Sequence, residues 1–242
     1  MAYKRAVAPA ALLRGEALTA AMVGIGMNFA AEPAVQPNIE DTLLSASVEG
    51  MEGDDLRVLA VLVTWLDVHH AWINADRLVR ATQTLNSPRV RAFWAAIGRW
   101  LEKDRRLARL TKLDQGKRID LLRTGSAFQV RRRGEDPRFQ GTPLRVPDGV
   151  LRRRTADVLT PEELAGRHLG YRYRVLIGPT YRADMWGALE HDPTLAPAAL
   201  ARQTYGSIAV ARLEPGTGRF ELGTHPAPSR ILSDTFVLPC QI

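Results

Sequence analysis

Three apolar stripes at helical spacing follow one another between residues 54 and 103, and they constrain the fold more than any other feature. The first stripe consists of Leu56, Leu59, Val63, Leu66 and His70. Asn74 is a natural N-cap for the second helix, while Ser87 and Pro88 end it and begin the third. The third stripe consists of Val90, Phe93, Trp94, Ile97 and Leu101. This periodicity predicts three amphipathic helices that pack on one another.

The pattern changes after these helices. RIDLLRTGSAFQVRRR favours two strands around the turn Thr124-Gly125-Ser126, which predicts a hairpin within residues 117–133. Three helices followed by a hairpin is the order of a winged-helix unit.

A similar order is predicted nearer the C-terminus. Tyr181 to Glu190 favours a first helix, and DPTLAPAALARQTYGS predicts a second helix, a glycine turn at Gly206 and an N-cap at Ser207 for a third. LEPGTGRFELG favours a second hairpin, near residues 212–222. The predicted fold class is therefore mainly α with small β-hairpins, built from two winged-helix-like units that a basic segment joins.

The corresponding domain organisation has four parts. Residues 1–53 are predicted as an N-terminal extension and linker, and residues 54–133 as the first winged-helix-like domain. Residues 134–180 form a basic connecting segment with one helix, capped at Thr160, and a short strand that ends at Gly178-Pro179. Residues 181–242 hold the second helix-turn-helix or winged-helix-like unit, and the tail beyond residue 214 follows no pattern that we can place.

The charge is concentrated in one part of the chain. The formal net charge is +7, and residues 99–154 carry 17 Lys+Arg against 7 Asp+Glu, whereas the segments before and after are slightly acidic. A solvated basic face is the simplest interpretation, but one dense basic belt in an otherwise acidic protein is also typical of a polyanion site.

Arginine suits both guanine edges and phosphates, so the basic residues are the candidate DNA contacts. We expect the helix near 88–103 to read duplex DNA with Arg91 and Arg99, on a face that also holds Ala95, and the belt at 117–154 to contact phosphates. The candidate DNA-binding residues are Arg89, Arg91, Arg99, Lys117, Arg118, Arg123, Arg131, Arg132, Arg133, Arg152, Arg153, Arg154 and Arg212.

Nothing in the sequence favours an enzyme, and we expect neither catalytic residues nor a cofactor. Asp67, His69 and His70 lack the i, i+4 histidine pair of a helical metal site; His70 is expected to end a core stripe and His69 to lie at the surface. Core packing is the default for the aromatic residues, and only Trp100 and Phe139 lie next to arginine in a way that suits base stacking.

The compartment is predicted from two features. A single cysteine, Cys240, fits a reducing environment. The apolar stretch at 17–31 is too short to span a bilayer, and Glu16 and Arg14 break the pattern of a secretory signal. We therefore expect a cytoplasmic protein without a membrane contact, in which residues 17–31 pack on the domain.

RYRVLIGPTYRADMWGALEHDPTLAPAALARQTYGS, with FQVRRRGEDPRFQGTPLRVP before it, resembles bacterial winged-helix transcriptional regulators. These include the antitoxin-like partners of nucleotidyltransferase toxins in abortive-infection systems. The resemblance implies a DNA-binding regulator with double-stranded DNA as its partner. The alternative is an antitoxin-like interaction module that neutralises a toxin-like enzyme and autoregulates its operon; a homodimer is a further candidate assembly. Glu214-Pro215-Gly216 departs from the pattern, because it ends the last helix early.

Overall fold

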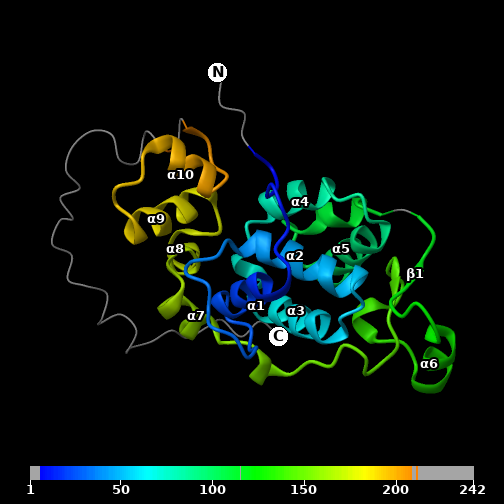
Figure 1. Cartoon of the computed structure of the whole chain (residues 1–242). Helices are drawn as coiled ribbons and strands as arrows, with labels where there is room; N and C mark the ends of the chain where they lie inside the picture. The colour runs from blue at the N-terminus through cyan, green and yellow to red at the C-terminus, as the bar shows by residue number, and fades with distance from the viewer. Residues whose placement is uncertain (1–5, 115, 209–210, 212–242) are drawn as a thin grey trace.

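The computed structural model describes residues 6–114, 116–208 and 211, and this part of the chain is mainly helical (Figure 1). The first five helices are α1 (Gly15–Gly24), α2 (Ile39–Glu52), α3 (Leu56–His69), α4 (Ala75–Gln83) and α5 (Pro88–Trp100). The caps expected from the sequence are present, since the side chain of Asn74 accepts the N–H of Arg77 and that of Ser87 accepts the N–H of Val90. The prediction of three helices between residues 54 and 103 is confirmed.

The other elements are shorter. They are the 3₁₀ turns η1 (His70–Trp72), η2 (Ala108–Lys112), η3 (Pro137–Phe139) and η4 (Thr155–Asp157), the strands β1 (Ile119–Asp120) and β2 (Leu144–Arg145), and the helices α6 (Ser126–Arg133), α7 (Pro161–Arg167), α8 (Leu169–Ile177), α9 (Tyr181–His191) and α10 (Pro197–Gln203). Helix α7 begins with the predicted capping box of Thr160 and Glu163. Figure 1 shows α6 and α10 at opposite ends of the molecule.

One large core lies around α2, α3 and α5 and runs in sequence from Leu18 to Tyr171. Two buried tryptophans have their N–H groups satisfied within it: Trp65 donates to the carbonyl of Ile25 (2.7 Å), and Trp94 to the hydroxyl of Ser47 (2.9 Å). Helices α1 and α2 contribute to this same core. Residues 15–52 therefore help to build the main domain, where the sequence suggested an extension and linker.

The hairpin predicted for residues 117–133 is wrong. Strand β1 pairs in parallel with β2, about two dozen residues further on, and the expected second strand is α6. Gly125 and Gly134 flank this helix with φ of 76° and 84°, a left-handed region that glycine adopts without strain. Between them, alanine, glutamine and arginine have good helix propensity, which outweighs the short alternation that had favoured a strand.

The strand predicted before Gly178 is also wrong, because that segment is α8. His168 caps the helix by accepting the N–H of Tyr171 on Nδ1 (3.0 Å). The buried residues of α8 are Tyr171 and Arg174, which are one helical turn apart. Burial along this segment therefore has the period of a helix rather than that of a strand.

The last described segment has a small core of its own. Met185 on α9 packs with Leu200 and Ala201 on α10 and with Ala211. A helical hydrogen bond joins the N–H of Ala211 to the carbonyl of Ser207 (3.0 Å), so a further helix begins after α10 as predicted. The second predicted hairpin, at 212–222, lies outside the described residues.

Candidate functional site

The middle of α5, the predicted reading helix, is buried, and its exposed side chains lie towards its two ends. Ala95, which was expected to share an exposed face with Arg91 and Arg99, has no exposed surface, and the residues from Ala92 to Gly98 are all buried. The error has a physical cause: small apolar residues complete the helix on the side opposite the main stripe, so this helix packs on both sides. It has no free face to enter a groove.

Two of the predicted DNA contacts on α5 instead hold the fold together. Arg89 donates to the carbonyls of Met51 (3.0 Å), Asp120 (3.3 Å) and Leu121 (2.8 Å). Arg91 donates twice to the carbonyl of Leu113 (2.9 and 2.7 Å). Because these guanidinium groups satisfy backbone acceptors, they connect α5 to the segments that follow it.

Two belt residues after α5 are engaged in the same way. Arg118 pairs with Glu135 and donates to the carbonyl of Thr142 (2.9 Å), which holds the β1 region against the loop after α6. Arg123 pairs with Asp54 (2.6 Å) at the start of α3. Both arginines therefore position the segments around α6.

The remaining predicted contacts that fall within the described residues are exposed. They are Arg99, Lys117, Arg131, Arg132, Arg133, Arg152, Arg153 and Arg154. Arg153 pairs with Asp67 (2.7 Å), and within residues 6–114, 116–208 and 211 the others form no ion pair. The adjacent arginines at the end of α6 are thus the densest set of uncompensated cations in this part of the chain, while Arg212 lies outside it.

A buried ionic network joins the C-terminal helices to the core. Arg174 of α8 bonds both carboxylate oxygens of Glu40 on α2 (2.6 and 2.8 Å) and both of Asp184 on α9 (2.7 and 3.0 Å). Arg77 of α4 bonds Glu40 from the other side (3.1 Å) and also pairs with Asp41. Glu40 and both arginines are almost completely buried. Three carboxylates thus face two guanidinium groups.

Burial and charge act in opposite directions on these groups. Burial alone would raise the pKa of Glu40, but Arg174 and Arg77 hold that pKa at about 2. For Asp184 burial outweighs the attraction of Arg174, and its pKa is raised. Tyr205 adds to the joint, since its hydroxyl donates to Asp41 (2.8 Å) and the guanidinium of Arg77 lies over its ring (3.8 Å). The link between α8–α10 and the core therefore combines this ionic network with the burial of Tyr171 in the hydrophobic core.

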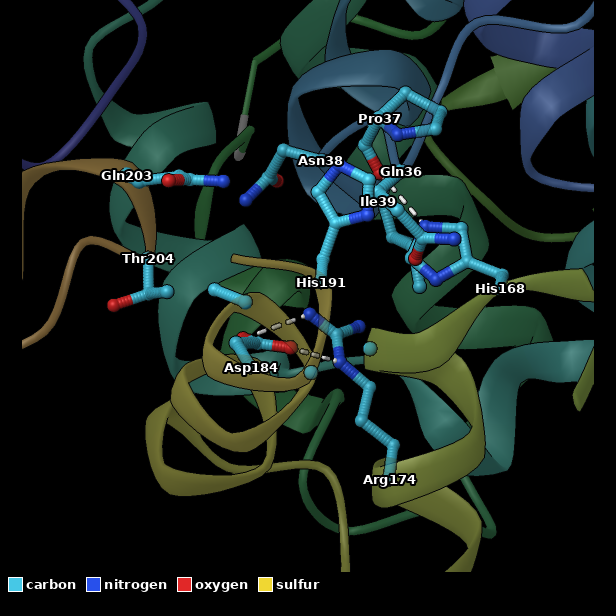
Figure 2. A pocket seen from close by; sticks show the side chains of 13 residues that line it. Gln36, Pro37, Asn38, Ile39, His168, Arg174, Asp184, His191, Gln203 and Thr204 are labelled. Atoms are coloured by element: carbon cyan, nitrogen blue, oxygen red, sulfur yellow. Dashed lines mark hydrogen bonds and ion pairs between the residues drawn. The ribbon is translucent and has the colours of Figure 1, made fainter. Parts of the chain in front are cut away.

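A small cavity of about 100 Å³ lies at this joint (Figure 2). Asp184 and Arg174 form its floor, and His168, His191 and Asn38 lie around it. Both ring nitrogens of His168 are occupied, one by the N–H of Tyr171 and the other by the carbonyl of Pro37 (2.8 Å). The N–H groups of Arg174 likewise all have acceptors within the chain. These polar groups therefore connect two parts of the chain to each other across the cavity.

The histidines of α3 differ from the prediction. His69 is buried and His70 is partly exposed, the reverse of what we expected. His69 bonds the hydroxyl of Tyr171 (2.7 Å) and the carbonyl of Leu159 (3.0 Å), and burial lowers its pKa to about 4. It is a neutral core residue. In the described part of the chain, no three His, Cys, Asp or Glu side chains gather as metal ligands.

Sequence reasoning missed two features. The ionic network was missed because Glu40, Arg77 and Arg174 are far apart in the chain and each resembles a surface residue. The other is Phe128, whose side chain is 57% exposed on α6. Helical spacing in SAFQVRRR places Phe128 beside Arg131 and Arg132, and this proximity is not apparent when the segment is read as a strand. Phe139, considered earlier for stacking, is instead buried beneath Trp100.

Comparison of the chain with protein-family models, with curated proteins and with solved structures finds no match. Among the residues that the structure describes, no helix has the length and apolar character needed to cross a membrane. The function is therefore inferred from the geometry of the chain itself.

Proposed function

We propose that the chain is a DNA-binding regulator that contacts duplex DNA through the unit formed by α9, α10 and the helical residues that follow the turn at Gly206. The observation that carries this proposal is the unit's geometry: two short helices, a tight turn and the start of a third helix around a small core of their own. This is the order of a helix-turn-helix, in which the helix after the turn enters the major groove.

The turn itself supports this interpretation. Tyr205 has a left-handed φ of 57°, and a Cβ atom at Gly206 would lie 2.0 Å from the terminal methyl of Met185. The chain therefore reverses within a few residues against α9, which brings the next helix close to α10. Arg202 is exposed on the last turn of α10 and is suited to a phosphate contact.

The α6 arginines supply a second, sequence-independent contact with nucleic acid that is separate from the helix-turn-helix unit. Because Arg131, Arg132 and Arg133 are adjacent, they point in different directions around the helix, which favours phosphates over base edges. They lie at the opposite end of the molecule from α10, so one groove cannot receive both sets (Figure 1). Each contact is therefore tested by its own variant.

Selection from a random duplex library tests the proposal. The wild-type chain is expected to enrich one recurrent motif, because a helix-turn-helix reads base edges. Arg202→Ala should keep the motif and weaken binding to all duplexes alike, as expected for a lost phosphate contact. Arg14→Ala removes an equal charge from an exposed site before α1 and serves as the control. Recovery of sequences without a common motif would overturn the proposal of a sequence-reading regulator.

A second candidate function, an antitoxin-like module that neutralises an enzyme partner, is favoured by α8. Val175, Leu176 and Ile177 are exposed at the end of this helix, beside a shallow groove lined by Tyr173 and Trp186. Large apolar groups gathered on a surface often mark a protein interface.

Co-purification from the native cell tests this alternative. A stoichiometric partner that is retained by the wild type and lost on Leu176→Asp would favour it. Phe128→Asp is the matched control, because Phe128 is 57% exposed on α6, which lies across the molecule from α8 (Figure 1), and Leu176 is 65% exposed. Equal recovery of the partner with all three proteins would exclude α8 as the interface.

A further inference from the structure

Helix α6 contributes little to the stability of the fold. Ser126 is its one buried residue, and the buried amide oxygen of Gln129 has no hydrogen-bond partner among the described residues. A helix of this length does not form by itself in water. Its conformation therefore depends on the segments at its two ends.

The two segments that flank α6 contact other parts of the chain. Before it, Arg123 pairs with Asp54, and the hydroxyl of Ser126 donates to the carbonyl of Leu122 (3.1 Å). After it, Glu135 is paired with Arg118. The result is a positioned helix that projects from the edge of the molecule (Figure 1).

The outer face of α6 combines one aromatic side chain with cations. Phe128 is followed three and four residues later by Arg131 and Arg132, so the three side chains share one face of the helix. Arg131, Arg132 and Arg133 are all exposed and form no ion pair within the described part of the chain. Phe128 therefore remains exposed within a strongly cationic surface.

We infer that this face of α6 binds single-stranded DNA, with Arg131 and Arg132 on phosphates and Phe128 stacked on an unpaired base. The arginines complement any polyanion, but the exposed ring selects among polyanions. In a duplex the faces of the bases are covered by their neighbours, whereas in a single strand they are open to an aromatic side chain. A membrane fits less well, because an interfacial helix needs a broad apolar face and Phe128 is the one large exposed apolar side chain on α6.

Binding of a labelled single-stranded oligonucleotide, followed by fluorescence anisotropy, tests this inference. Phe128→Ala should weaken binding about 5- to 150-fold, the range for removing one stacking aromatic side chain, and should leave the salt dependence unchanged. Arg131→Ala combined with Arg132→Ala removes two phosphate contacts and should instead flatten the salt dependence by about 1.4 units of log–log slope. Phe128→Trp should retain or improve binding. Leu176→Ala, at an equally exposed apolar site on α8, is the control and should have no effect.

Three outcomes would overturn the inference. They are an unchanged affinity of Phe128→Ala for the single strand, an equal loss of affinity for polyphosphate, and a loss confined to vesicles that contain anionic lipid. None of them bears on the duplex contact at Arg202, because this residue belongs to α10, and α10 and α6 lie at opposite ends of the molecule (Figure 1). Failure here and failure of the proposed function are therefore distinguishable. Circular dichroism of Phe128→Ala should match the wild type, because the side chain is mostly exposed.

Discussion

Arg174→Met should be among the most destabilising single substitutions in the chain. The substitution keeps a long side chain in place but removes the cation that bonds Glu40 and Asp184. Arg174 provides the ion pair of Asp184, so the variant leaves one buried carboxylate unpaired and the other with Arg77 alone. Breaking a buried ion pair in this way costs about 3–5 kcal/mol.

The lowered pKa of Glu40 follows from the same network and makes its contribution depend on pH. A pKa of about 2 in place of an ordinary 4.5 corresponds to roughly 3 kcal/mol of preference for the ionised, paired carboxylate. Because this folded-state pKa is lowered, its stabilisation is present above pH 4.5 and is lost as the pH falls towards 2. The difference between wild type and Arg174→Met should therefore be largest near neutral pH and shrink in acid.

Urea unfolding followed by tryptophan fluorescence measures the free energy directly. At pH 7 we expect a loss of about 3–5 kcal/mol for Arg174→Met. The control is Arg172→Ala on the same helix, whose ion pair with Glu190 is about one-third exposed and should contribute less than about 1 kcal/mol. Similar small losses in both variants would show that the ionic network does not hold α8 and α9 to the core.

Three further outcomes are expected. Burial lowers the pKa of His69 and of His168 to about 4, so the folded state loses stability as the pH falls from 6.5 towards 4. The loss should be about 2 kcal/mol for each histidine at pH 5. Urea unfolding at pH 7 and pH 5 checks this, and an equal free energy of unfolding at both pH values would contradict it. Gly187→Ala should cost about 1–3 kcal/mol in the same assay, because its Cβ would lie 2.6 Å from the backbone of α8, whereas Gly166→Ala, with open space around it, should be neutral or stabilising. Arg89→Ala should lower the melting temperature and not the DNA affinity of the folded protein, because its partners are carbonyls of the chain itself; a purely affinity-based loss would restore it as a DNA contact.

Local signals in the sequence were sufficient for the helices that have a clear capping residue, but not for α6 and α8. Asn74, Ser87 and Thr160 cap the helices predicted for them, because N-capping depends on residues within one turn of each other. Pro197 likewise begins α10 as expected. Such interactions are complete within a few residues, so a single sequence contains them.

Pairings over long distances in the chain were not predictable in the same way. The partner of β1 is β2, and nothing in the local pattern around Ile119 indicates a parallel pairing with Leu144. A hairpin at this position requires residues 126–133 to be its second strand, whereas they form α6. The cationic face of α6 was consequently recognised as a cluster of arginines but without Phe128.

The basic belt shows the corresponding limit for the candidate site. Composition identified it correctly as a concentration of positive charge. It could not distinguish Arg89 and Arg118, which donate hydrogen bonds to backbone carbonyls, from the exposed Arg131 and Arg132. That distinction depends on which backbone carbonyls lie nearby, and these come from segments 21 to 38 residues away.

The central claim is that the helix-turn-helix unit contacts duplex DNA, and the salt dependence of binding tests it most directly. Anisotropy titrations of a labelled duplex between about 50 and 200 mM salt give the slope of log affinity against log salt concentration. The account predicts saturable binding with a clearly negative slope that Arg202→Ala flattens by about 0.9 units and Arg14→Ala leaves unchanged. Absence of saturable binding at the lowest salt concentration, or equal slopes for the wild type and Arg202→Ala, would contradict it.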